Sequence, residues 1–476
     1  MNFHSFEFFV FLLLVLGLHH VLPRPQRRWL LLAASYWFYG AWDWRFLGLI
    51  LLSTTLDWWL ALRIEDERTP SRRRRWIVLS VVANLGILGV FKYTDFFLAG
   101  FCALTGADPN AWLLHIVLPP GISFFTFQSM SYTIDVYRGH VPARRSFADF
   151  ALFVAFFPQL VAGPIVKANE FFPGYDAWQP PRDRDLQRAV TLILVGLVQK
   201  TVFADNLAPI VDAWFGTAST EGLMHTSPGF LPALTGVLAF GLQIFFDFAG
   251  YSNIAIGAAL LFGYHFPINF RRPYLAANVA EFWHRWHISL STWLREYLYI
   301  PLGGNRHGPF CTQRNLMLTM LLGGLWHGAS MNFVAWGFLH GLYLAVHRQW
   351  RAHVVPRLGE RLAGSVPYRL SAWLLTLAAV GVAWVFFRAR SFDDARFVLG
   401  ELLTPQTLGT SLLSTAWLVL IAGALLFARW LDAGILEERF HDASPFRRGL
   451  VFAGLLFVLV LFAATDATGA FLYFQF

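Results

Sequence analysis

The chain has 476 residues, of which 56% are hydrophobic, and its mean hydropathy is +0.50. This composition excludes an ordinary soluble domain and predicts a multi-pass membrane protein. The formal net charge of +8, from 37 basic and 29 acidic residues, would suit nucleic-acid binding in a soluble protein. Here the basic residues cluster between apolar runs, which indicates cytoplasmic loops and contact with anionic membrane lipid. We therefore expect no nucleic-acid partner.

The apolar runs predict an all-α polytopic membrane protein with roughly eleven or twelve transmembrane helices. Since no internal repeat is visible, we expect a single membrane-embedded domain over residues 1–476. The residues Pro119–Gly121 interrupt the apolar run Trp112–Tyr137. Proline and glycine also break Phe150–Val166, which is expected to be re-entrant. The predicted crossings are Phe6–Leu22, Trp29–Ala41, Phe46–Leu62, Trp76–Phe101, Trp112–Tyr137, Ala189–Ala204, Phe230–Phe262, Asn315–Leu325, Phe333–Val346, Leu370–Phe387, Leu412–Trp430 and Leu450–Ala464.

The charges of the loops predict the orientation of the chain in the membrane. The segment from Arg63 to Arg75 ends in four consecutive arginines, whereas Asp205–Gly229 contains no Lys or Arg. Under the positive-inside rule the first segment is cytoplasmic and the second is an extracytoplasmic loop. The N-terminus is then extracytoplasmic, and the arginine-containing segment Tyr264–Gln313 faces the cytoplasm, whereas Ala168–Arg188 is expected to be a polar loop.

Histidines concentrate in a mostly apolar stretch that begins at Glu281 and ends at Gly341. Ionisable residues inside a membrane are costly and usually mark a functional site. If Glu281–Leu298 is one helix, His287 falls inside its apolar arc, whereas His284 falls among the charged residues. The helical period therefore predicts different environments for these two histidines.

Glycines surround the second group of candidate residues. Gly323, Gly324 and Gly328 bracket Trp326 and His327. Glycine at such positions either lets one backbone approach another closely or breaks a helix, and broken helices at membrane depth line cavities or are buried in protein. His327 is therefore expected to face a cavity wall rather than lipid.

These segments together resemble the membrane-bound O-acyltransferase family, in its branch of bacterial alginate O-acetyltransferases. The resemblance covers most of the chain and implies a fold of transmembrane helices and re-entrant segments around a central tunnel. It is carried by FWHRWHISLSTWLREYLYIPLGGNR after Glu281, GGLWHGA at Gly323–Ala329, PPGISFFTFQSMSYTIDVYRG at Pro119–Gly139, FFPQLVAGPI at Phe156–Ile165, FDFAGYSNIAIG at Phe246–Gly257 and the terminal FLYFQF.

The resemblance implies that His327 and His287 are catalytic. A neutral histidine can accept the proton of an attacking hydroxyl, since its unperturbed pKa is about 6.5. His327 matches the family's active-site histidine, and His287 matches a second position, where it would donate to the developing oxyanion or orient the acyl group. The alternative for His327 is a core histidine bonded to a backbone carbonyl. No third ligand joins His284 and His287, so no metal site is expected.

Several other residues are candidates for contact with substrate or donor. Arg285 and Arg295 could bind the phosphates of coenzyme A, with lipid headgroup contact as an equal alternative. Asp247 could line the acceptor tunnel, or could be a buried carboxylate paired with an arginine or capped by Ser252 or Tyr251. The full set of binding candidates is Arg285, Arg295, Asp247, Tyr251, Trp286 and Trp326.

The resemblance implies a bacterial inner-membrane O-acetyltransferase. It would move acetyl from a cytoplasmic thioester, acetyl-CoA, toward an extracytoplasmic polysaccharide, without a bound cofactor. Alginate is the first acceptor to consider, with peptidoglycan and cellulose as alternatives. An esterase-like periplasmic acetyltransferase is expected as a partner. A polytopic transporter is the competing class, because broken helices and buried charges also occur in transporters.

Overall fold

The computed structural model describes residues 1–161, 163–217, 220–226, 229–404, 415–430, 443–463 and 472. Regular structure within these residues is helical, which confirms the all-α prediction. The chain forms two compact units, and each is made of separated segments. Unit 1 contains Met1–Ile193 and Tyr251–Ile268, and unit 2 contains Leu194–Gly250 and Asn269–Phe476. The single domain over the whole chain stays a prediction.

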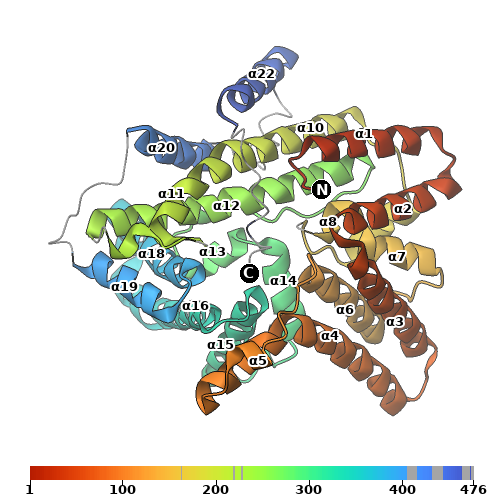
Figure 1. Ribbon diagram of the computed structural model, residues 1–476, viewed down its shortest axis with the longest axis horizontal. Helices are drawn as coiled ribbons and strands as arrows, with labels where there is room; N and C mark the ends of the chain where they lie inside the picture. Colours follow the sequence, from red (N-terminus) through yellow and green to blue (C-terminus); the bar gives the residue numbers. More distant parts are fainter. Residues whose placement is uncertain are drawn as a thin grey trace. The chain divides into compact units, whose positions relative to one another are not determined.

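Unit 1 holds the helices drawn from red to yellow in Figure 1. Helix α3 packs on α4 and α6, and Asp57 of α3 lies fully buried between them. Its carboxylate accepts hydrogen bonds from Ser80 Oγ at 2.8 Å and Asn84 Nδ2 at 2.9 Å. The helices are α1 (Phe6–Val21), α2 (Arg24–Asp43), α3 (Leu47–Asp66), α4 (Pro70–Thr105), α5 (Pro109–Trp112), α6 (Ile122–Arg138), α7 (Phe147–Ala155), α8 (Phe157–Leu160), α9 (Ala168–Asp176) and the first part of α10 (Asp183–Leu197).

Both predicted interruptions occur in unit 1. Helix α6 begins directly after Gly121, whose φ of +73° is in the left-handed region. A Cβ there would lie 2.6 Å from the carbonyl oxygen of Leu160, so only glycine fits. The expected re-entrant segment is likewise broken, since α7 ends at Ala155 and the short α8 follows Phe156.

Two segments predicted as loops contain helices instead. The predicted polar loop Ala168–Arg188 contains α9 and the start of α10. The predicted outer loop Asp205–Gly229 begins with helix α11 (Asp205–Phe215), which continues from α10 through a π-helical turn at Val198–Ala204. The count of loop charges did not predict α11, whose apolar residues recur at helical spacing and are buried in the core of unit 2. They are Leu207, Ile210, Val211, Trp214 and Phe215.

Unit 2 contains an antiparallel pair, α15 (Gly308–His327) and α16 (Met331–Gln349), whose helices lie side by side (Figure 1). A Cβ on Gly324 would collide with the carbonyl oxygen of Phe333, and one on Gly337 with that of Met320. The glycines therefore permit close packing and do not break α15. The other helices are α12 (Phe230–Leu261), α13 (Val279–Arg285), α14 (Ile288–Leu294), α17 (Val355–Ala363), α18 (Val366–Arg388), α19 (Phe392–Leu403), α20 (Thr415–Trp430) and α22 (Pro445–Phe462).

Six helical segments in the described part of the chain are long and apolar enough to cross a membrane, which confirms a polytopic protein. They are Arg24–Asp66, Pro70–Thr105, Asp183–Phe215, Phe230–Leu261, Val366–Arg388 and Pro445–Phe462, and Phe6–Val21 is a shorter apolar helix. The larger number of crossings stays a prediction. Leu412, Ala464 and the terminal FLYFQF, apart from Leu472, lie outside the described residues.

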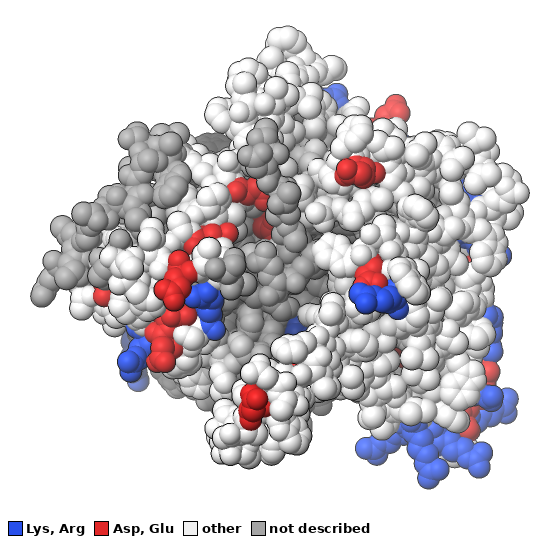
Figure 2. Space-filling model, viewed as in Figure 1, with Lys and Arg blue, Asp and Glu red and all other residues white. Residues whose placement is uncertain are grey.

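The orientation can be tested at two exposed threonines. Thr69 precedes the arginine run at the start of α4, where Lys and Arg gather on the surface (Figure 2), and Thr220 lies in the predicted outer segment. We expect Thr69→Cys to react with a membrane-impermeant maleimide only after the cells are opened, and Thr220→Cys to react in intact cells. Labelling of both positions from the same side would contradict this topology.

Candidate active site

His287 lies at a break between two short helices, so the predicted continuous helix Glu281–Leu298 is wrong. Helix α13 ends at Arg285, and His287 adopts φ +41° and ψ 57° before α14 begins. Tertiary hydrogen bonds override the helical period here. Ile288 N donates to Asn269 O at 2.9 Å, and Ser289 Oγ donates to Asn269 Oδ1 at 2.6 Å. A left-handed backbone at a bulky residue is uncommon and persists only where the surroundings enforce it.

The imidazole of His287 is completely buried, whereas His284 is exposed, as predicted. The ring of His287 packs edge-on against Phe248, with centroids 4.6 Å apart, and contacts Trp326 at 6.1 Å. Burial lowers the pKa of His287 to about 3. The side chain is therefore neutral at physiological pH and can both donate and accept a hydrogen bond.

His327 is the last residue of α15 and is 4% exposed. Its ring lies among aromatic rings, with centroid distances of 4.9 Å to Trp336 and 5.3 Å to Phe387. Trp326 contacts His327 at 5.0 Å and His287 at 6.1 Å, so one indole touches both predicted catalytic rings. The fold thus gathers the two histidines, 40 residues apart in sequence numbering (327 − 287), around the same tryptophan.

His340, on α16, is a third buried histidine of this group and is 0% exposed. Trp283 Nε1 donates to His340 Nδ1 at 3.3 Å, which places the proton of a neutral His340 ring on Nε2. Trp336 contacts both His340, at 4.7 Å, and His327, at 4.9 Å. From the sequence, His340 could be placed near the site but its hydrogen bond to Trp283 could not be predicted, because the two residues are 57 positions apart.

Three of the binding candidates have structural partners. Trp286 is buried and stacks on Phe282 at a centroid distance of 5.6 Å, so it belongs to the core of unit 2. Trp326 joins the histidines, as described above. Tyr251 belongs to unit 1, where its hydroxyl lies 3.2 Å from His4 Nδ1 and its ring contacts Phe3.

Asp247 is the buried carboxylate of α12, and its partner is a lysine rather than the arginine considered from sequence. Lys200 Nζ lies 2.7 Å from Asp247 Oδ1 and 2.8 Å from Asp205 Oδ1. The backbone N–H of Leu472 donates to Asp247 Oδ2 at 2.8 Å, which ties the end of the chain to α12. These contacts favour a structural role for Asp247, because a buried charge is stable only when it is paired and hydrogen-bonded.

A pocket of about 800 Å³ opens in unit 2 between α13, α14, α15 and α16. Trp283 forms part of its wall and also contacts Trp336, at a centroid distance of 5.7 Å. The arginines and histidines that line the pocket are His284, Arg295, His347, Arg348 and Arg351. The pocket therefore has a basic lining, and the packed indoles of Trp283 and Trp336 lie between it and His327.

Only one of the two predicted phosphate-binding arginines lines this pocket. Arg295 does, whereas Arg285 lies 2.5 Å from Glu281 in an ion pair and donates to Arg272 O at 3.4 Å. Arg348, at the end of α16, and Arg351, in the π-helical turn Trp350–Val354 that follows, were not predicted. The available signal was the basic pair His347-Arg348 with Arg351 three residues later. Basic residues directly after a predicted crossing, here Phe333–Val346, are however common at any membrane boundary.

The described residues contain no group of three or more His, Cys, Asp or Glu that could hold a metal ion. Metal-independent chemistry stays a prediction. What the fold and the site define is a multi-helix membrane protein with buried neutral imidazoles beside a basic pocket. This combination suits transfer of a group from a phosphate-bearing donor, with histidine as the base.

Comparison with known proteins identifies the family. Residues 31–382 match the model of MBOAT, the membrane-bound O-acyltransferase family. The chain is 39% identical to a probable alginate O-acetylase of Azotobacter vinelandii, over 98% of both chains. It is 42% identical to a probable alginate O-acetylase of Pseudomonas aeruginosa, over 81% of this chain and 72% of that protein. It is 39% identical to a peptidoglycan O-acetyltransferase of Helicobacter pylori, over 79% of this chain and 73% of that protein.

The chain therefore belongs to the membrane-bound O-acyltransferase family. This confirms the predicted fold class and the predicted type of enzyme, an O-acyltransferase. An acyl donor and a hydroxyl acceptor follow from that class of reaction. The roles of individual residues stay predictions and are developed below.

Proposed function

We propose that this chain moves acetyl from acetyl-CoA, bound in the basic pocket of unit 2, toward an extracytoplasmic polysaccharide, with alginate as the preferred final acceptor. The observation that carries the proposal is the short series of ring contacts between the pocket wall and His327. Trp283 lines the pocket and contacts Trp336, and Trp336 contacts His327. The similarity to proteins named for alginate O-acetylation supports the choice of acceptor.

In this mechanism His327 is the general base. It takes the proton of the acceptor hydroxyl as the oxygen attacks the thioester carbonyl, and the thiolate of coenzyme A leaves with a proton. The neutral His287 donates to the carbonyl oxygen as negative charge develops there. Trp336 Nε1 is a buried N–H group with no hydrogen-bond partner among the described residues, so it is a further donor for a substrate oxygen.

The pocket binds the polar part of the donor. Guanidinium groups form paired hydrogen bonds with phosphate oxygens, and Arg295, Arg348 and Arg351 all line the same pocket. The volume of about 800 Å³ falls within the usual range for a small-molecule site. Arg285 lies outside this lining, in an ion pair with Glu281.

Replacement of the pocket arginines should weaken donor binding. We expect Arg348→Gln and Arg351→Gln each to raise the KM for acetyl-CoA about tenfold with little change in kcat, since each removes one charged hydrogen-bond donor. Arg295→Gln should raise the KM for acetyl-CoA by a similar factor.

Arg285→Ala is the matched control and should leave the KM for acetyl-CoA unchanged. Initial rates at several acetyl-CoA concentrations measure the effect. A KM that rises in Arg285→Ala but not in the three pocket variants would move the donor site elsewhere.

Purified protein in nanodiscs tests the proposed function. Acetyl-CoA hydrolysis or transfer should be stimulated by alginate oligosaccharides and less by peptidoglycan fragments. The reverse preference would favour the peptidoglycan acetylation named for the Helicobacter relative. Absence of thioester consumption together with solute uptake would favour a transporter.

The location and the partner are also part of the proposal. The six apolar helical segments support a multi-pass protein, which we place in the bacterial inner membrane. An extracytoplasmic esterase-like acetyltransferase would receive acetyl from this chain and complete its transfer to the polymer. The membrane-spanning helices place the transfer site within the membrane, whereas a polymer acceptor requires an open surface outside the membrane.

A further inference from the structure

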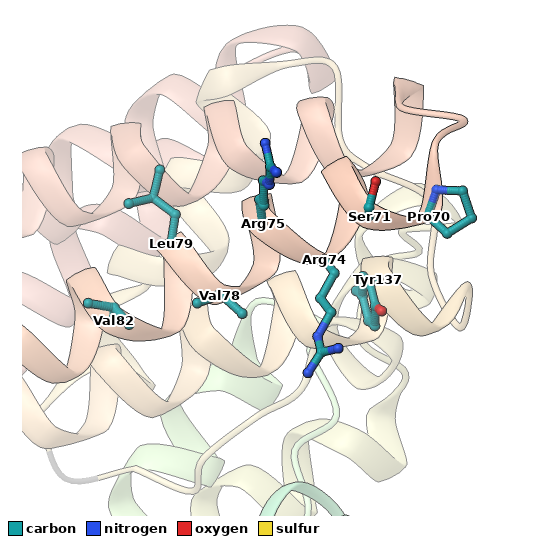
Figure 3. A pocket seen from close by; sticks show the side chains of 8 residues that line it. All are labelled: Pro70, Ser71, Arg74, Arg75, Val78, Leu79, Val82 and Tyr137. Carbon is teal, nitrogen blue, oxygen red and sulfur yellow. The ribbon is translucent and has the colours of Figure 1, made fainter.

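A groove on the surface of unit 1 is separate from the acyl-transfer site. It has a volume of about 760 Å³ and lies along the beginning of α4, with Tyr137 of α6 at its side (Figure 3). Its lining from α4 includes Ser71, Arg74, Arg75, Val78, Leu79 and Val82. These residues follow the spacing of one helix face, because neighbours on a face recur every three or four positions. The groove is therefore a single stripe along α4.

The stripe changes from basic to apolar along the helix axis. Arg74 and Arg75 lie in the first two turns, and Val78, Leu79 and Val82 follow. The three apolar side chains are 51%, 44% and 61% exposed, respectively, although they belong to a helix that can cross a membrane. The opposite face of α4 is the one that packs in unit 1, with Ile77, Ser80 and Asn84 buried. The exposed apolar part of the stripe is thus positioned to face lipid.

The two arginines of the groove are available to a ligand. Neither Arg74 nor Arg75 forms an ion pair with an acidic residue in the described part of the chain, and both are exposed. Their neighbour Arg73 is committed to the fold, since it donates to Ile64 O and Val136 O at 3.1 Å each. In Figure 3, Arg74 extends beside Tyr137, while Arg75 extends from the other side of the helix stripe.

The start of α4 adds to the positive potential. Thr69 makes no side-chain capping bond, and Pro70 has no N–H, so the N–H groups of Ser71 and Arg72 have no partner within the helix. A helix N-terminus carries a partial positive charge that favours anions. The basic end of the groove therefore has backbone N–H groups and the Ser71 hydroxyl, with the guanidinium groups of Arg74 and Arg75 on either side of the stripe.

The stripe fits within one leaflet of a bilayer. At a rise of about 1.5 Å per residue, Ser71 and Val82 are about 16 Å apart along the axis, and one leaflet with its headgroup region is about 20 Å thick. From these observations we propose that the groove binds one anionic phospholipid. Its phosphate lies against Ser71, Arg74 and Arg75, and an acyl chain lies along Val78, Leu79 and Val82. The excess of positive charge favours an anionic over a zwitterionic headgroup.

Lipid binding to the full-length purified protein tests this site. Native mass spectrometry should detect phosphatidylglycerol bound about tenfold more tightly than phosphatidylcholine, and Arg74→Gln/Arg75→Gln should remove this preference. Arg68→Gln/Arg72→Gln is the matched control, because it removes two arginines of the same segment that do not line the groove. It should retain the preference.

A second variant tests the apolar half without changing charge. Val78→Trp/Val82→Trp fills the groove and should weaken phosphatidylglycerol binding about as much as the double arginine variant does, with unchanged thermal unfolding of the protein. Equal binding of the two lipids by the wild type would overturn the proposal. So would equal losses in both arginine pairs, or displacement of the lipid by inorganic phosphate alone, since these results would show a diffuse charge effect or a simple anion site.

Discussion

Replacing His327 with alanine should abolish acetyl transfer while the protein still inserts into the membrane. Loss of a general base typically costs about 10²- to 10⁴-fold in rate, and more when the same group positions the substrate. Because His327 is only 4% exposed at the end of α15, a base from solvent has little access to replace the missing imidazole. Acetylation rates in membranes matched for protein level measure the effect. Near-wild-type activity of His327→Ala would end its assignment as the base.

A loss of packing could imitate a loss of catalysis, because the imidazole contacts Trp336 and Phe387. His340→Ala is the matched control, since His340 is equally buried and contacts the same Trp336. We expect it to leave more activity than His327→Ala at similar thermal stability. The exposed His284 should tolerate alanine with little effect. Equal losses in the His327 and His340 variants would show that packing of the aromatic group, rather than a base, limits the reaction.

Replacing His287 should cause the second largest loss, and the choice of substitute separates chemistry from backbone strain. Glycine adopts the φ of +41° without strain, so His287→Gly removes the imidazole while keeping the break between α13 and α14. We expect about a 10²- to 10³-fold loss of kcat, the usual effect of removing an oxyanion donor. Asparagine also tolerates a left-handed backbone and offers an amide donor, so His287→Asn should recover part of the activity.

Another non-glycine residue in the same conformation provides the control for this pair. Arg272 has φ +48° and also belongs to unit 2. Arg272→Gly should retain most activity, because it changes a left-handed position without removing an imidazole. Rates and thermal unfolding are measured on these three variants and on His287→Ala. Full activity of His287→Gly, with a loss only in His287→Ala, would show that position 287 matters for its backbone alone.

Composition and motif were sufficient for the class of protein. An apolar content of 56% requires a membrane environment, and long helical runs satisfy backbone hydrogen bonds there without partners from elsewhere in the chain. Of the two roles expected for the glycines around His327, close backbone approach is the one found, since Gly324 and Gly337 meet between α15 and α16. The different environments of His284 and His287 were also predicted, although the continuous helix used to derive them does not exist.

Tertiary contacts decided the rest, because they join residues that no local pattern relates. Asn269 takes the hydrogen bonds that would otherwise continue a helix through His287. Lys200 pairs with Asp247 across 47 positions, and the backbone of Leu472 reaches the same carboxylate across 225 positions. The basic pocket likewise draws Arg295 and Arg351 from different helices. The sequence by itself therefore determined a membrane acyltransferase, and the roles of its histidines stay predictions. Only the packed chain determined which polar groups meet, since partner choice for a buried charge depends on distance in space.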